Sequence, residues 1–116
     1  MELRRRIPRQ VIGWTGKCIL EDDPFAGWVE CRAIDISLIG VGLEILDLMP
    51  NDLVGRGLQV EVHPPTSKAV SIRMTGEVRN VGPGPTGGTR IGLEFTGLSE
   101  TERSILDTLE LMQVAF

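Results

Sequence analysis

Apolar and polar residues alternate along most of the chain, in short stretches separated by turn-forming residues. Alternation with a period of two is typical of β-strands, and several short strands at close spacing are typical of an all-β barrel or sandwich. The pattern predicts an antiparallel sheet that closes or folds on itself. Its six strands are expected near residues 10–20, 27–37, 41–47, 57–63, 69–80 and 89–96.

The stretches between these strands are rich in Pro, Gly, Asp and Asn, as expected of hairpin connections. They cover residues 21–26, 48–56, 64–68 and 81–88. The glycine-rich stretch 81–88 is interpreted as a plain hairpin loop rather than an anion site, because its prolines remove N–H donors and no helix follows it.

The period changes near the C-terminus. Ser99 and Glu102 have the spacing of a capping box, which satisfies backbone N–H groups at the start of a helix. An apolar stripe at intervals of four, three and four residues follows, formed by Ile105, Leu109, Met112 and Phe116. We therefore predict a helix over 99–114 that covers one end of the barrel, with a partner-binding helix as the alternative.

One predicted strand changes phase in its middle. Val29, Cys31 and Ala33 share one face, but the next apolar residues are Ile34, Ile36 and Leu38. A β-bulge between Ala33 and Ile34 explains the change, because one extra residue reverses the face of every later side chain. Asp35 and Ser37 would then point away from the core.

The turn at 21–26 also suggests a register for the first hairpin. Centring the hairpin there places Cys18 opposite Cys31 and Ile12 opposite Ser37, with an uncertainty of about two positions. The chain before residue 10 would then lie beside the stretch from Asp35 to Gly40.

The chain has 116 residues and a formal net charge of −4, which fits one domain with a core of its own. Residues 1–9 carry +3 and the remainder −7. No uncharged apolar run is long enough to cross a bilayer, and polar residues interrupt any signal-peptide core after the arginines. We expect a cytoplasmic protein without membrane insertion.

Chemical motifs are sparse. Cys18 and Cys31 are expected to be reduced core thiols, with their pairing left open, and His63 a solvated loop residue. No metal-ligand spacing is present, and residues 13–17 are too short for a phosphate-binding loop. The chain is therefore predicted to be neither an enzyme nor a metalloprotein, and to need no cofactor.

Two motifs stand out. Arg5 and Arg9 form an RxxxR step, and Asp35, Ser37 and Gly40 form [DN]xSxxG. In this order and at this spacing they resemble the PilZ domain family, and residues 91–109 resemble its last strand and C-terminal helix. The resemblance implies one domain over 1–116: a mobile arginine-rich segment at 1–9, a six-stranded antiparallel split barrel at 10–96 and a C-terminal α-helix at 99–114. It also implies binding of the bacterial messenger cyclic di-GMP.

The resemblance also implies roles for individual residues. Arg5 and Arg9 would bind guanine edges and phosphate, for which the planar arginine fork is suited. Asp35 would accept guanine N–H donors, and Ser37 would donate to phosphate or bridge through water. Gly40 would permit the turn and close approach of the ligand. The neighbouring Arg4 and Arg6 are also expected at the ligand. An arginine directly before the RxxxR step, here Arg4, resembles the pattern of family members that bind a stacked pair of ligand molecules, often as dimers.

These observations favour a cyclic di-GMP receptor and adaptor whose N-terminal segment folds onto the barrel with the ligand and signals through an unidentified effector protein. The first alternative is a PilZ-like adaptor that binds no nucleotide and acts only through protein contacts. An oligonucleotide-binding barrel is a weaker alternative, because the body is acidic and aromatic residues make up 4% of the chain. Nothing positive supports a flavin-binding split-barrel enzyme.

Overall fold

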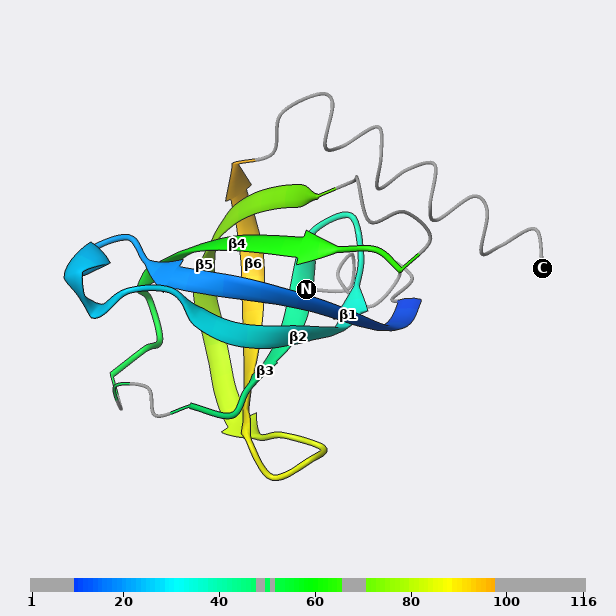
Figure 1. Cartoon of the computed structure of the whole chain (residues 1–116). Coiled ribbons are helices and arrows are strands. Elements are labelled where there is room, and N and C mark those ends of the chain that lie inside the picture. Colours follow the sequence, from blue (N-terminus) through cyan, green and yellow to red (C-terminus); the bar gives the residue numbers. More distant parts are fainter. Residues whose placement is uncertain (1–9, 48–49, 51, 66–70, 98–116) are drawn as a thin grey trace.

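Six antiparallel strands form a closed barrel (Figure 1). The computed structural model describes residues 10–47, 50, 52–65 and 71–97. Around the barrel the strands follow the order β1-β2-β3-β6-β5-β4, and pairing of β1 with β4 closes the ring. The strands are β1 (Gln10–Leu20), β2 (Val29–Ile36), β3 (Gly40–Ile45), β4 (Gly57–His63), β5 (Ile72–Pro83) and β6 (Thr89–Gly97).

The predicted all-β barrel of six antiparallel strands is therefore confirmed. The predicted helix over 99–114 and the arginine-rich segment 1–9 lie outside the described residues. The described part contains one short 3-10 helix, η1 (Pro24–Ala26), between β1 and β2. No helix among the described residues is long and apolar enough to cross a membrane.

Two predicted connections differ from the structure. The stretch 48–56 joins β3 to β4, which are not neighbours in the barrel, so it is a crossover and the prediction of a hairpin there is wrong. The stretch 81–88 begins inside β5, which pairs with β6 as far as Pro83 opposite Thr89. The hairpin loop is therefore confined to residues 84–88, because the ladder continues through Val81 and Gly82 despite the following proline.

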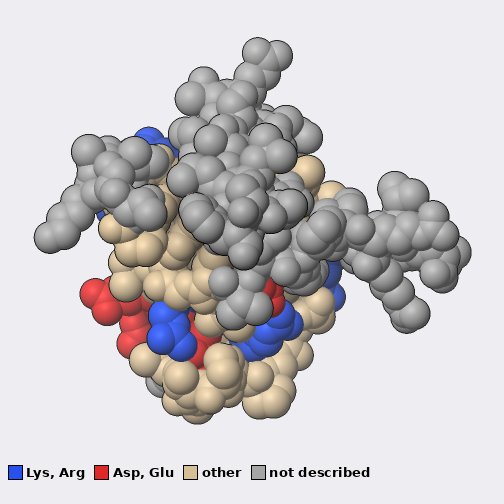
Figure 2. Space-filling view, turned by 90° about the vertical axis from the view of Figure 1, so that its right-hand side faces the viewer, with Lys and Arg blue, Asp and Glu red and all other residues tan. Residues whose placement is uncertain are grey.

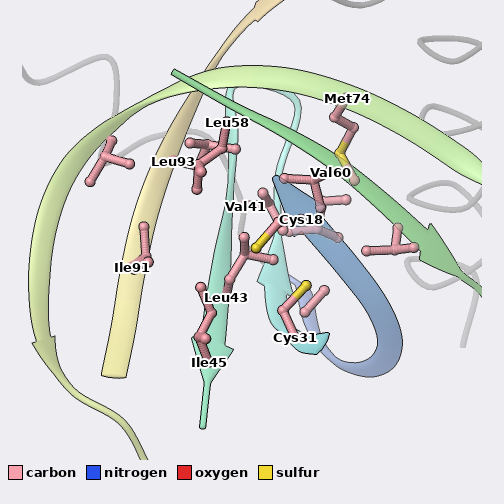
Figure 3. Packing of buried hydrophobic residues seen from close by; sticks show 14 of the residues in the cluster. Cys18, Cys31, Val41, Leu43, Ile45, Leu58, Val60, Met74, Ile91 and Leu93 are labelled. Carbon is pink, nitrogen blue, oxygen red and sulfur yellow. The ribbon is translucent and has the colours of Figure 1, made fainter. Parts of the chain in front are cut away.

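The core consists of the inward side chains of all six strands, together with Leu53 from the connection between β3 and β4. Figure 3 shows ten of them, labelled, projecting into the barrel. Burial of these side chains removes apolar surface from water and supplies most of the driving force for folding. The fully buried large side chains are Leu43, Ile45, Leu53, Leu58, Ile72, Met74, Ile91, Val41, Val60, Val62, Val78 and Cys18.

Strand β3 differs from the others because all six of its residues are buried. Val41, Leu43 and Ile45 face the core, whereas Gly40, Gly42 and Glu44 occupy the outer face. Groups from neighbouring strands and from the loop 84–88 cover this outer face. It is therefore a second, smaller packed layer on one side of the barrel.

The predicted bulge in β2 is present. Ala33 pairs with Leu43 and Asp35 pairs with Gly42, so Ile34 is the extra residue between them. Because paired residues in a sheet share a face, Asp35 lies on the outer face together with Gly42, as predicted. Ser37, two residues later, is 7% exposed and buried in the turn that follows β2.

The predicted register of the first hairpin is wrong by two residues near the turn, and by three beyond the irregularity between Val11 and Trp14. Cys18 pairs with Val29 and Cys31 pairs with Gly16, whereas Ile36 lies opposite Gln10. A shift of two preserves the face of each side chain, so both thiols still point into the core (Figure 3). A side-chain hydrogen bond with Cys31, together with burial, raises the pKa of the Cys18 thiol, and both cysteines are free, as expected.

Closure of the barrel depends on a close approach at Gly16 of β1. Gly16 pairs with Val62 of β4. A β-carbon on Gly16 would meet the carbonyl oxygen of Glu61 and lie 2.8 Å from Cγ1 of Val62. Gly13, on the same strand, has no heavy atom within 4 Å of the corresponding position.

We therefore expect Gly16→Ala to destabilise the barrel by about 1–3 kcal/mol, because strand β4 must move to admit the methyl group. Urea unfolding followed by circular dichroism measures the loss. Gly13→Ala is the matched control, with an expected change within about 0.5 kcal/mol. Equal unfolding midpoints for the two variants would contradict the close approach at Gly16.

Candidate functional site

The three described motif residues lie where β2 turns into β3. Asp35 is near the end of β2, Ser37 follows that strand, and Gly40 opens β3. The candidate arginines Arg4, Arg5, Arg6 and Arg9 lie outside the described residues. Strand β1 nevertheless begins at Gln10, opposite Ile36, and Val11 lies opposite Asp35. The chain thus enters the barrel directly beside the second motif.

Hydrogen bonds fix the turn from Ser37 to Gly40. The Ser37 N–H donates to the Gly40 carbonyl at 2.9 Å. The Ser37 hydroxyl accepts from the Ile39 N–H at 3.2 Å and lies 3.5 Å from the Gly40 carbonyl oxygen. The Ile39 carbonyl in turn accepts from the Phe95 N–H of β6 at 2.8 Å. The serine therefore shapes the turn as well as offering a hydroxyl.

Gly40 has a structural role besides the one predicted. Its φ lies outside the left-handed region, where the described positive-φ residues are Gly27, Gly55 and Gly87. A β-carbon on Gly40 would instead meet the carbonyl oxygen of Leu93 on β6. Glycine at this motif position therefore allows β3 and β6 to pair closely.

Asp35 forms an ion pair with an arginine that the motif does not contain. Arg90 of β6 donates from Nη2 to Oδ2 of Asp35 at 2.7 Å. The Asp35 side chain is 16% exposed and the Arg90 side chain 35%. Strand β3 lies between them, and Gly42 provides the gap across which Arg90 reaches Asp35.

A small pocket of about 40 Å³ lies next to the motif turn on the outside of β3, β6 and β5. Arg79 stands at this pocket and forms ion pairs with Glu77 at 2.8 Å and with Glu94 at 3.2 Å. The pocket residues are Ile39, Gly40, Arg79, Asn80, Gly92, Leu93 and Glu94.

Charges of both signs alternate on the barrel surface. In the coloured part of the face in Figure 2, basic and acidic side chains lie next to one another. The ion pairs Asp35–Arg90, Glu61–Arg73 and Glu94–Arg79 join neighbouring strands or cross one strand. The described barrel surface therefore lacks the single-sign stripe expected of a protein that binds long nucleic acids.

The glycine-rich stretch forms a hairpin loop, as expected, and it also holds a carboxylate of the same chain, a contact that the sequence interpretation did not include. The Glu44 carboxylate, on the outer face of β3, accepts the Thr86 N–H at 2.8 Å, the Thr86 hydroxyl at 2.6 Å and the Gly88 N–H at 3.1 Å. A β-carbon on Gly84 would meet Oε2 of Glu44. The loop 84–88 thus closes over β3 by coordinating a carboxylate of the same chain.

Two larger hollows lie elsewhere on the described barrel. One, of about 340 Å³, includes Trp28, whose ring lies 4.9 Å from Nζ of Lys17. The other, of about 350 Å³, lies beside Glu30, Glu44 and Thr86. Neither contains a motif residue. Within the described ranges no group of three His, Cys, Asp or Glu residues could hold a metal ion, and His63 lies 3.6 Å from Glu61.

Comparison with known proteins identifies a family and a fold. A family model described as PilZ domain matches residues 3–110, a range that includes both motifs. No curated protein matches the chain in sequence.

Three solved structures are similar to this chain. The inhibitor of motility MotI/DgrA of Bacillus subtilis gives a TM-score of 0.77 at 16% identity, covering 97% of this chain and 52% of that one. YcgR of Escherichia coli in complex with c-di-GMP gives 0.72 at 19%, covering 97% and 46%. The PilZ domain of the same YcgR with c-di-GMP gives 0.70 at 20%, covering 97% and 94%. The chain thus spans about half the length of the first two, and the likeness shows the fold.

The Glu44 site generates a prediction about pH. Hydrogen bonds from Thr86, with the hydroxyl as the largest contribution, lower the pKa of Glu44. The ionised carboxylate therefore stabilises the folded loop above the ordinary glutamate pKa, and this contribution is lost as the pH falls through the lowered value. We expect the amide resonances of Thr86 and Gly88 to titrate with a midpoint below that of an ordinary glutamate.

Thr86→Val should raise this midpoint, because it removes the strongest donor, whereas Thr86→Ser keeps the hydroxyl and should leave it low. Glu44→Gln should abolish the transition. A two-dimensional NMR titration measures all four proteins. An ordinary midpoint in the wild type would contradict the assigned role of the loop.

Proposed function

This chain belongs to the PilZ domain family, and on that premise we propose that it is a non-enzymatic receptor for cyclic di-GMP. The observation that carries the proposal is the pairing of Gln10 with Ile36, since it brings the chain that follows the RxxxR step against the Asp35–Gly40 motif. The YcgR structures, solved with c-di-GMP, support the choice of ligand.

The chemistry of the two motifs fits a guanine dinucleotide. Each guanine presents O6 and N7 acceptors to an arginine fork, and each phosphate accepts two parallel charge-assisted hydrogen bonds. Arg5 and Arg9 would supply these donors, with Arg6 beside them. Asp35, on the outer face of β2, would accept from guanine N1–H and N2–H₂.

Ser37 and Gly40 would contribute to ligand binding mainly by fixing the shape of the turn between β2 and β3. The Ser37 hydroxyl accepts the Ile39 N–H and donates to the Gly40 carbonyl at 3.5 Å, a long contact that a phosphate oxygen or a bridging water would replace as acceptor. Gly40 keeps β3 close to β6, and the pocket on the outside of these strands lies at the same place. The ligand would thus rest on the outer face of the barrel.

We further propose that ligand binding orders the N-terminal segment. Four arginines within residues 1–9 repel one another, and a dianionic ligand neutralises them, so the segment would fold against the barrel only in the complex. This change would alter the surface offered to an effector protein in the cytoplasm.

Exposed apolar side chains support the adaptor part of the proposal. Phe25, Leu46 and Val54 are 99%, 73% and 62% exposed. They lie at strand ends away from the Ser37–Gly40 turn, on the β1–β2 and β3–β4 connections. A partner could therefore contact the barrel without covering the ligand.

Calorimetric titration with cyclic di-GMP tests the proposed ligand. We expect saturable binding by the wild type, and a loss of about 1–3 kcal/mol in Arg5→Ala and in Arg9→Ala, the usual loss for a charge-assisted contact. Arg73→Ala is the matched control and should bind as the wild type does. Arg73 lies on β5, is 77% exposed, and forms its ion pair with Glu61 of β4, outside the motifs. Absence of heat at high micromolar ligand would favour the adaptor that binds no nucleotide.

Arg4 gives a separate prediction about stoichiometry. If Arg4 helps to hold a stacked ligand pair, Arg4→Ala should retain binding but reduce the ligand number per protomer from two to one. The same titration, combined with light scattering to detect a ligand-induced dimer, measures both quantities. An unchanged number of ligands per protomer would show that Arg4 does not hold a second ligand molecule.

A further inference from the structure

Arg90 contacts the second motif through Asp35, although neither motif includes it. It sits on β6 opposite Glu44, and its guanidinium reaches diagonally across β3 to Asp35 on β2. A link between two strands that are not neighbours is possible only where the strand between them carries no side chain.

Gly42 provides that position. It pairs with Asp35 on one side and with Gly92 on the other. A β-carbon on Gly42 would lie 2.6 Å from Oδ1 of Asp35 and 3.0 Å from Nη2 of Arg90. Both contacts are with the ends of side chains, so a methyl group there would displace the ion pair and leave the backbone in place.

The ion pair affects what Asp35 can do for a ligand. A cyclic guanine dinucleotide brings two phosphate charges to the site, and an uncompensated carboxylate would repel them. A carboxylate that must accept two guanine donors also has to be held in one orientation, because each bond depends on direction. The contact at 2.7 Å meets both needs, as it neutralises Asp35 and fixes Oδ2.

We propose that Arg90 is the positioning residue for guanine recognition, acting through Asp35 across the gap at Gly42. The inference rests on the proposed function, because it assigns Asp35 to the N1–H and N2–H₂ edge of guanine. Arg90 determines how strongly the site prefers guanine over a base that lacks the 2-amino group, and it need not contact the ligand itself.

Cyclic di-IMP is the probe that isolates this edge. Hypoxanthine lacks the 2-amino group of guanine but keeps N1–H, O6 and N7, so the ratio of the two affinities reports the bond from N2–H₂ to Asp35. We expect the wild type to prefer cyclic di-GMP by about tenfold or more, and Asp35→Ala to lose this preference. Arg90→Ala should lower it to below about threefold, because the carboxylate loses the contact at Oδ2 that orients it.

Two further variants separate positioning from general damage to the fold. Gly42→Ala keeps both charges but displaces them, so its preference should fall as in Arg90→Ala. Arg90→Lys keeps the charge without the planar fork and should give a value between Arg90→Ala and wild type. Arg73→Ala, which removes another cross-strand arginine–carboxylate pair, should keep the wild-type preference. Thermal unfolding confirms that each variant is folded.

Calorimetric competition measures every ratio, and its outcomes are distinct. A lowered ratio in both Arg90→Ala and Gly42→Ala supports the inference. Equal losses for the two ligands, or a wild-type ratio in these variants, would overturn it while leaving the proposed receptor intact. A wild type that binds neither ligand would overturn the receptor proposal and this inference with it.

Discussion

One extra residue in β2 determines the outer surface of this barrel. Side chains of a strand alternate between faces, so without the bulge at Ile34 the carboxylate of Asp35 would point into the apolar core. Burial there without a partner would cost several kcal/mol. With the bulge, Asp35 joins the outer face of β3, where it meets Arg90, and the strand ends in the turn that holds Ser37.

The outer face of β3 joins the Asp35–Arg90 ion pair, the motif glycine and the Glu44 site. Two of its three residues, Gly40 and Gly42, have no side chain, and the third, Glu44, is enclosed by the loop 84–88. The glycines allow a close strand approach and a diagonal ion pair, while Glu44 fixes the loop beside them. The same small set of positions thus serves both the packing of the barrel and the proposed recognition of guanine.

Much of the fold could be predicted from local patterns, because alternation and turn residues are properties of adjacent positions. The six strands and the bulge follow from them, since a phase error within one strand is visible in the sequence alone. The crossover from β3 to β4 could not be predicted, because Pro, Gly and Asp serve a crossover as well as a hairpin. Near the turn the hairpin register was wrong by two, because a shift of two leaves every side chain on its face; beyond the irregularity between Val11 and Trp14 it was wrong by three.

The sequence by itself determined the barrel class and the two motifs, since strand period and motif spacing are encoded locally. Only the tertiary structure decided which residues outside the motifs contact them. Arg90 and Asp35 are 55 positions apart in the chain, and no local pattern relates them. They meet because β6 pairs with β3 and Gly42 leaves the space between. Likewise, the hairpin loop 84–88 holds a carboxylate because the pairing of β3 with β6 places Glu44 beside it.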